Sequence, residues 1–125
     1  MKKLLITLGL IASFSANADW VNAFQDNVRY EPTFSKRLKV NSDLVAVWWK
    51  VFQPNGDSQV TLEQYNCKDT TARFISYTRY LPNNQPDILN SFNWGEINNP
   101  FKDIEPQTFL ARKFMFACVN IQNIK

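Results

Sequence analysis

Leu44–Phe52, with the sequence LVAVWWKVF, is the stretch that decides the fold. Val, Trp and Phe favour strands, and a nearly unbroken apolar run of this length is typical of a strand buried on both faces. Successive side chains of a strand point to opposite faces, so Trp48 and Phe52 are expected opposite Trp49. Pro54–Asp57, the sequence PNGD, follows directly, and its Asn-Gly pair predicts a hairpin.

Further strands are predicted on both sides of this run. Residues 59–67 and 72–80 show strand patterns and complete an antiparallel meander with Leu44–Phe52. Upstream, residues 24–30 are a candidate additional strand. Residues 35–43 mix charges without a clean period, so they are interpreted as a loop or an edge strand.

The C-terminal third is predicted to be a loop followed by a helix. Residues 81–99 are rich in Pro and Asn and are interpreted as a surface loop, with a candidate short strand near 92–94. Pro106 suits the first turn of the helix. Apolar residues then recur at helical spacing and are expected to face the sheet: Leu110, Ala111, Phe114, Ala117, Cys118 and Ile121.

The chain has two cysteines, Cys67 and Cys118. Two cysteines in an exported chain are interpreted as one disulfide, which here would tie the helix to the sheet. A bridge enclosing about fifty residues stabilises the fold by roughly 4 kcal/mol in the chain-entropy model. The predicted fold class is therefore α+β, an antiparallel meander with a C-terminal helix packed on one face and held by a disulfide.

The N-terminus has the pattern of a secretory signal peptide. Lys2 and Lys3 form a positive segment, residues 4–14 an apolar one, and Ala16–Ala18 a small-residue cleavage site. The apolar run is too short to span a bilayer. We therefore predict that the chain is exported and that the leader is removed.

The predicted organisation is a signal peptide at 1–18 and one domain at 19–125. No cysteine stands at the cleavage site, so we expect a periplasmic or cell-surface protein without a lipid anchor. The formal net charge is +3, and Lys2 and Lys3 of the leader supply two of those charges. The near-neutral remainder argues against a nucleic-acid partner.

The composition argues against most catalytic chemistry. The chain contains no histidine, so histidine-based triads lack their base and the usual zinc sites lack their imidazoles. The nearest pair of carboxylates, Asp103 and Glu105, is interpreted as helix-entry chemistry. The sequence therefore predicts no enzyme, no cofactor and no metal site.

Several short motifs together resemble the surface-adhesin protein E family. They are Tyr65–Cys67, Arg73, Ser76, Trp94, Ile104–Thr108 and Phe116–Cys118. The resemblance covers most of residues 19–125, and it implies an antiparallel sheet with a C-terminal helix tied to it by a disulfide. It also implies adhesion, the binding of host extracellular-matrix or serum proteins.

Two candidate binding surfaces are predicted. Lys36, Arg37 and Lys39 form a basic cluster that could meet a sulfated glycan, anionic lipid headgroups or an acidic protein patch, the alternative being a solvated loop. Trp48 and Phe52 form an aromatic patch on the sheet face that a single helix leaves uncovered. That patch could contact a ligand or a second copy in a homodimer, the alternative being that another segment covers it as core.

The predicted function is an adhesin-like binding protein of the cell envelope, whose rigid disulfide-stapled sheet contacts a protein or glycan ligand. The main alternative is a periplasmic inhibitor or immunity-type protein that blocks an enzyme with a plug formed by residues 82–99. An enzyme that works with carboxylates alone is a third, weaker hypothesis.

Overall fold

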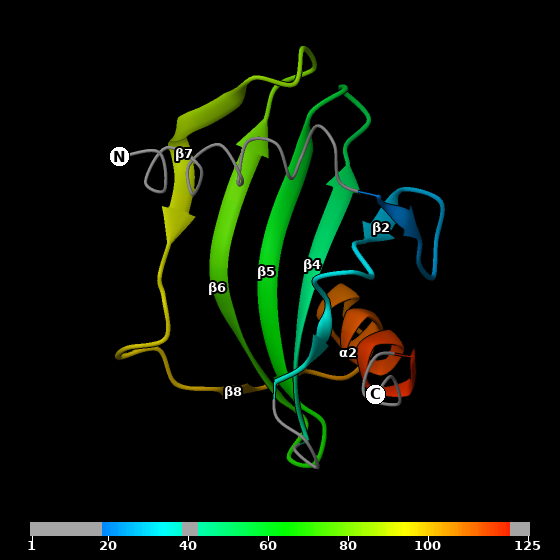
Figure 1. Cartoon of the computed structure of the whole chain (residues 1–125), viewed down its shortest axis with the longest axis vertical. Helices are drawn as coiled ribbons and strands as arrows, with labels where there is room; N and C mark the ends of the chain where they lie inside the picture. The colour runs from blue at the N-terminus through cyan, green and yellow to red at the C-terminus, as the bar shows by residue number, and fades with distance from the viewer. Residues whose placement is uncertain (1–18, 39–42, 121–125) are drawn as a thin grey trace.

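The structure is a computed structural model that describes residues 19–38 and 43–120. The predicted signal peptide and Ile121 lie outside the described residues. Among the described residues one antiparallel sheet has eight strands, six of them in the order β1-β2-β4-β5-β6-β7 (Figure 1), and the short strands β3 and β8 pair with β4 and β6. Their bounds are β1 Val21–Asn22, β2 Val28–Tyr30, β3 Lys36–Arg37, β4 Leu44–Phe52, β5 Ser58–Asn66, β6 Thr71–Tyr80, β7 Pro86–Asn93 and β8 Lys102–Asp103. The helix α2 (Phe109–Asn120) packs against this sheet, which confirms the predicted fold class.

The predicted hairpin joins β4 and β5. Gln53 N–H donates a hydrogen bond to the Asp57 carbonyl at 2.8 Å, and Asn55 Oδ1 accepts one from Asp57 N–H at 3.0 Å. Gly56 has φ +95°, a backbone conformation that favours glycine. The local sequence therefore sets both the turn and the register of β4 and β5.

The N-terminal segment contributes short pieces to the free edge of β4. Of the strand predicted at 24–30, only Val28–Tyr30 (β2) is a strand. It forms a hairpin with β1 and pairs with the C-terminal half of β4. A two-residue strand, β3 (Lys36–Arg37), pairs with Val45 and Ala46 lower on the same edge. The interpretation of 35–43 as loop or edge strand thus holds for its described part.

The loop predicted at 81–99 is wrong in its central part, and the short strand predicted near 92–94 overlaps the end of the strand found there. Residues 86–93 form β7, which pairs with β6 from Ser76↔Asn93 to Tyr80↔Pro86. A register irregularity sets only Thr78 of β6 against four residues of β7. A strand interrupted in this way does not need the regular alternation of apolar and polar residues by which strands are predicted. Pairing with a long neighbouring strand, rather than local propensity, makes this segment a strand.

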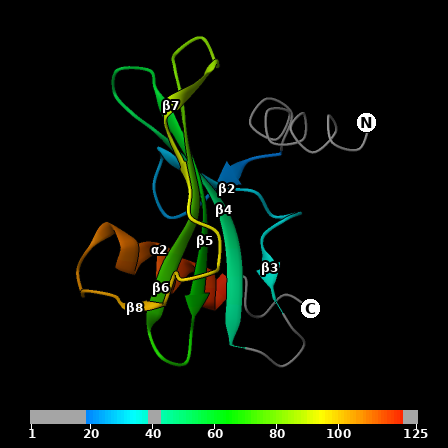
Figure 2. The same ribbon diagram turned by 90° about the vertical axis from the view of Figure 1, so that its left-hand side faces the viewer.

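The core lies between α2 and one face of β4 and β5. Val45, Val47 and Trp49 point to this face and are fully buried. Aromatic rings from distant segments pack around the Trp49 indole: Phe24, Tyr30 and Phe116. In side view α2 lies on one side of the sheet (Figure 2), as expected for a single helix on a meander.

The helix begins at Phe109 rather than at Pro106. Thr108 Oγ1 accepts a hydrogen bond from Ala111 N–H at 3.1 Å, which caps the first turn. Phe114 and Ala117 of the predicted stripe are buried, and Leu110, Ala111 and Cys118 are partly buried against the core. Lys113 is buried as well, which the apolar pattern does not predict.

The predicted disulfide joins Cys67, directly after β5, to Cys118 on α2. The two residues are 51 positions apart, and their Cα atoms are 5.7 Å apart. The bridge closes a loop that contains β6, β7 and the short strand β8 (Lys102–Asp103), which pairs with β6. The helix is therefore fixed to the sheet covalently as well as by packing.

Candidate binding surface

Four aromatic side chains form an exposed series beside α2, which we call the aromatic row. Its members are Phe74 and Tyr77 of β6, Phe92 of β7, and Trp94, which follows β7. Phe74, Phe92 and Trp94 are 42%, 54% and 49% exposed. Exposed aromatic groups gathered in one place on a protein mark an interaction site more often than single exposed residues do.

The rings of the row are in contact from end to end. The ring centroids of Tyr77 and Phe92 are 6.2 Å apart, and those of Phe92 and Trp94 are 5.7 Å apart with the planes inclined by 23°. The Trp94 and Phe74 centroids are 6.5 Å apart. The row is thus one continuous surface.

A bulge in β6 brings Phe74 and Tyr77 to the same face. Paired residues of antiparallel strands share a face, and Tyr77 pairs with Thr61 and Phe74 with Glu63, both on the α2 side of β5. The register shifts between these pairs, leaving Ile75 as the extra residue. Without this bulge, residues three positions apart would point to opposite faces.

The same bulge anchors Trp94. The Ile75 carbonyl accepts hydrogen bonds from Trp94 N–H at 2.8 Å and from Gly95 N–H at 3.2 Å. The Asn99 side-chain amide donates to the carbonyls of Phe74 and Gly95, both at 2.7 Å. The backbone that carries Phe74 and Trp94 is therefore held by the sheet and by a loop residue together.

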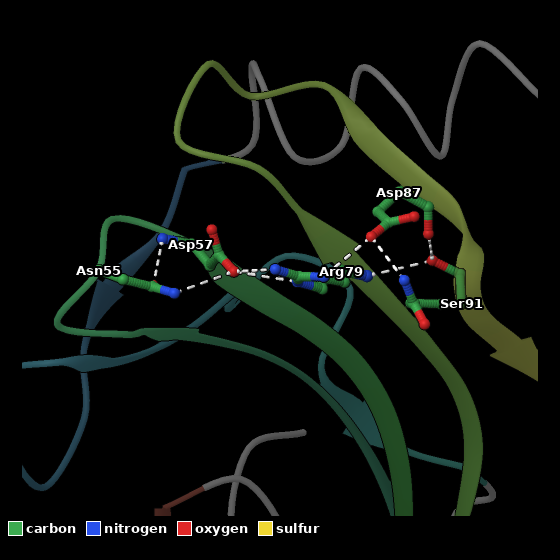
Figure 3. A network of polar contacts seen from close by, with 6 residues as sticks. Asn55, Asp57, Arg79, Asp87 and Ser91 are labelled. Atoms are coloured by element: carbon green, nitrogen blue, oxygen red, sulfur yellow. Dashed lines mark hydrogen bonds and ion pairs between the residues drawn. The ribbon is translucent and has the colours of Figure 1, made fainter.

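The other end of the row is held by ion pairs, which we call the Arg79 bridge (Figure 3). Arg79 Nε donates to Asp57 Oδ2 at 3.0 Å, and Arg79 Nη1 donates to Asp87 Oδ2 at 2.9 Å. Ser91 Oγ accepts a hydrogen bond from Arg79 N–H and donates one to the Asp87 carbonyl. The bridge ties the β4–β5 turn and the irregular part of β7 to β6.

Hydrogen bonds and the charge of Asp57 raise the pKa of Arg79 above its ordinary value, with a further contribution from Asp87. The guanidinium therefore remains charged wherever the protein is folded. Two carboxylates face this single positive charge, so the Arg79 bridge has a formal net charge of about −1.

A buried polar cluster lies under α2, next to the row. Lys113 Nζ donates to Glu63 Oε2 at 2.6 Å, and Thr61 Oγ1 donates to the same oxygen at 2.8 Å. The Tyr65 hydroxyl donates to Glu63 Oε1 and accepts from Trp49 Nε1–H at 2.8 Å. Burial, and then the charge and hydrogen bond of Glu63, raise the pKa of Tyr65 well above its usual value.

The cluster fixes the helix to the sheet rather than offering a reactive group. Glu63 is fully buried and Lys113 nearly so, and each of them is paired. Lys113 Nζ also lies 5.8 Å from the centroid of the Phe74 ring, a distance that allows a cation–π interaction with this member of the row. The buried charges thus support the exposed rings.

Two hollows flank Trp94. One of about 380 Å³ is lined by Tyr77, Arg79, Asn90, Phe92 and Trp94. The other, of about 430 Å³, lies between Trp94 and the start of α2, with Phe74, Asn99 and Leu110 in its wall. Ligand sites combine apolar walls with a few polar groups in this manner.

The predicted aromatic patch is only partly exposed. Trp48 lies on the sheet face opposite Trp49, as predicted, and is half-buried beside a hollow of about 190 Å³. Phe52 is 39% exposed, and the side chains of Lys50 and Arg29 lie over its ring at 5.2 and 5.4 Å. These two residues do not join the aromatic row, which lies on the opposite face.

The predicted basic cluster is only partly described. Lys36 and Arg37 form β3 on the edge of β4, on the far side of the sheet order from β7. Lys39 lies outside the described residues. In the sheet order, β4, β5 and β6 lie between β3 and β7.

Sequence reasoning missed the aromatic row. Phe92 and Trp94 are two positions apart, which is a strand signal, but they lie in a segment whose composition favours a loop. Phe74 and Tyr77 are an odd number of positions apart, and only the bulge at Ile75 brings them together. Residues 86–93 of the plug predicted at 82–99 belong to β7. The inhibitor hypothesis stays a prediction.

The described residues show neither a cluster of metal ligands nor a membrane-spanning helix. Between residues 19–38 and 43–120 no group of three or more metal-ligating side chains comes together. Asp103 and Glu105 are exposed in the segment before α2. No helix in the described part of the chain is long and apolar enough to cross a membrane.

The resemblance to the surface-adhesin protein E family is not tested by comparison with known proteins. No family model, no curated protein and no solved structure matches this chain.

Proposed function

We propose that this chain is an exported cell-envelope protein that binds a macromolecular ligand, protein or glycan, through the aromatic row. The observation that carries the proposal is the row itself, with rings that are half exposed on a backbone fixed by the bulge, Asn99 and the Arg79 bridge. Leaving aromatic side chains in water costs free energy, so a protein that displays several together gains by covering them.

The disulfide and the leader support export. Structural disulfides form and persist in oxidising compartments such as the periplasm and the cell exterior. The Cys67–Cys118 bridge and the signal-peptide pattern of residues 1–18 are independent features that favour the same compartment. In this proposal the helix, sheet and disulfide form a rigid support, and no residue performs covalent chemistry.

The location is tested by protease accessibility of the chain on intact cells and on cells with an opened outer membrane. Digestion on intact cells supports surface display, and digestion only after opening supports a periplasmic protein. An unprocessed chain recovered from the cytoplasm would contradict export.

Binding is tested with the exported chain on immobilised collagen, laminin, fibronectin and purified peptidoglycan. We expect saturable binding to at least one of them, weakened about tenfold or more by Trp94→Ala. Leu89→Ala is the matched control, because Leu89 lies on β7 and is 92% exposed but is not part of the row. Binding that Trp94→Ala leaves intact, and that salt and a Lys36→Ala/Arg37→Ala variant abolish, would move the site to the basic cluster.

A further inference from the structure

We propose that removal of the leader creates an ion pair between the new α-ammonium group of Asp19 and the buried carboxylate of Glu31, and that this pair stabilises the processed chain. The inference rests on the proposed export of the chain and concerns residues that take no part in the aromatic row. Three observations carry it: Asp19 follows the predicted cleavage site, its backbone nitrogen contacts Glu31, and Glu31 has no other counter-charge in the described residues.

Glu31 is buried without a cation beside it. Its side chain is 1% exposed in the uncleaved chain. Between residues 19–38 and 43–120, no lysine or arginine forms an ion pair with it. Glu63, which is fully buried as well, has such a partner in Lys113. A buried carboxylate without a counter-charge destabilises a fold, because its lost hydration is only partly replaced.

The two carboxylate oxygens of Glu31 have different partners. Oε1 accepts hydrogen bonds from Thr33 N–H at 2.6 Å and from Phe34 N–H at 3.0 Å, which closes the turn after β2. Oε2 accepts a hydrogen bond from the backbone nitrogen of Asp19 at 3.1 Å, across twelve positions of sequence. The turn therefore accounts for Oε1, and Asp19 accounts for Oε2.

The N-terminal hairpin holds this contact in place. β1 pairs with β2 through Val21↔Tyr30, so the residues just before β1 run beside those just after β2. Glu31 N–H also donates a hydrogen bond to the Trp48 carbonyl of β4 at 3.1 Å. Sheet pairing, and not a mobile side chain, thus brings the backbone nitrogen of Asp19 to Glu31.

Cleavage changes the chemistry of this nitrogen. In the uncleaved chain it belongs to a neutral amide that donates one hydrogen bond. Hydrolysis of the Ala18–Asp19 bond by a leader peptidase consumes one water molecule and leaves a carboxylate on Ala18 and an α-ammonium group on Asp19. An α-amino group is mostly protonated at neutral pH. The contact with Glu31 Oε2 then joins two full charges of opposite sign, which makes the hydrogen bond stronger.

The ion pair strengthens the segment that covers one edge of the sheet. β2 pairs with β4, and the rings of Phe24 and Tyr30 pack against Trp49 in the core. The processed chain is therefore expected to be more stable than the same chain with a neutral N-terminus. Leader removal and final folding are linked in this way, because the counter-charge of Glu31 exists only after cleavage.

The test is a two-by-two comparison on the exported chain, whose first residue is identified by N-terminal sequencing. Wild-type and Glu31→Gln chains are unfolded in urea with the α-amino group free and after its selective acetylation, which mass spectrometry verifies. Glu31→Gln keeps an oxygen that can accept the hydrogen bonds of the turn but removes the negative charge. Acetylation keeps an N–H on Asp19 but removes the positive charge.

We expect the chain to begin at Asp19 and the two changes to be coupled. Acetylation should lower the folding equilibrium constant of the wild type about tenfold or more, and that of Glu31→Gln less than about threefold. Glu105→Gln is the matched control, because it removes an exposed glutamate before α2, and it should respond to acetylation as the wild type does.

A second variant keeps the test independent of how well Glu31→Gln folds. Insertion of one alanine before Asp19 retains an α-ammonium group but moves it away from Glu31. This chain, with its N-terminus checked by sequencing, should be about as unstable as the acetylated wild type.

Equal losses on acetylation in the wild type and in Glu31→Gln would overturn the ion pair and leave the proposed function standing. An alanine-extended chain as stable as the free wild type would do the same, and so would an exported chain that begins at a residue other than Asp19. A chain that is neither exported nor processed would overturn the inference together with the proposed export.

Discussion

The two halves of one sheet face use aromatic residues in opposite ways. Over β4 and β5, helix α2 covers the face, and Trp49 and Tyr65 are fully buried around a paired Glu63 and Lys113. Over β6 and β7 the face carries the aromatic row, whose rings are about half exposed. The difference is set by where the helix lies and not by the kind of residue.

Geometry explains why one half stays open. A helix is about 10 Å across, and strands lie about 4.8 Å apart, so one helix covers roughly two strands of a sheet. The disulfide at Cys67 ties α2 to the end of β5, which leaves β7 beyond its reach. The open half can therefore serve binding without loss of the core.

The largest effect should come from breaking the buried ion pair of the covered half. Glu63→Leu leaves Lys113 buried without a counter-charge, which costs about 3–5 kcal/mol. The double variant Glu63→Leu/Lys113→Met removes both charges and should recover most of that loss. Urea unfolding measures the free energy of unfolding of both variants. A double variant as unstable as the single one would show that the loss does not come from the unpaired charge of Lys113.

Removal of the disulfide should cost slightly less. Cys67→Ser and Cys118→Ser each open a loop of 51 positions, and the chain-entropy model gives a loss of about 4 kcal/mol as an upper value. Thermal unfolding of each variant, compared with the wild-type chain with and without reductant, measures the effect. Equal stability of oxidised wild type and variants would remove the structural role of the bridge.

Alkaline pH should weaken the covered half through Tyr65. Its folded pKa is raised, so the folded chain keeps a proton that the unfolded chain loses above about pH 10. Stability is therefore fully present below that pH and falls by about 1.4 kcal/mol per pH unit above it, until the folded pKa is reached. Unfolding from pH 8 to 11.5 should show a shallower decline for Tyr65→Phe, and parallel curves would contradict this assignment.

The smallest effect on stability should come from the open half. Phe92→Ala removes a ring that is 54% exposed and should change the free energy of unfolding by about 0.5 kcal/mol or less. Phe114→Ala, the same change in the covered half, should cost about 3–5 kcal/mol. Similar losses for the two variants would show that the row is a structural part of the fold.

Much of the fold could be predicted because the signals are local. Leu44–Phe52 is a strand with the predicted bounds, the Asn-Gly turn follows it, and the apolar stripe of α2 surrounds Phe114. The sequence did not reveal the burial of Lys113, although Lys113 stands at helical spacing from Leu110 and Ala117. A lysine is normally predicted to be exposed, and only the structure shows that Lys113 is buried in an ion pair with Glu63.

The amino-acid sequence by itself determined the meander, the C-terminal helix and the pairing of two cysteines, because hydrophobic periodicity, turn chemistry and cysteine number act over short stretches. Only the tertiary structure decided that Pro86–Asn93 is a strand, since its partner β6 supplies the hydrogen bonds that its own sequence does not favour. The tertiary structure also decided the aromatic row. The bulge at Ile75 and the limited width of α2 place these rings together and leave them exposed, and both depend on contacts between distant segments.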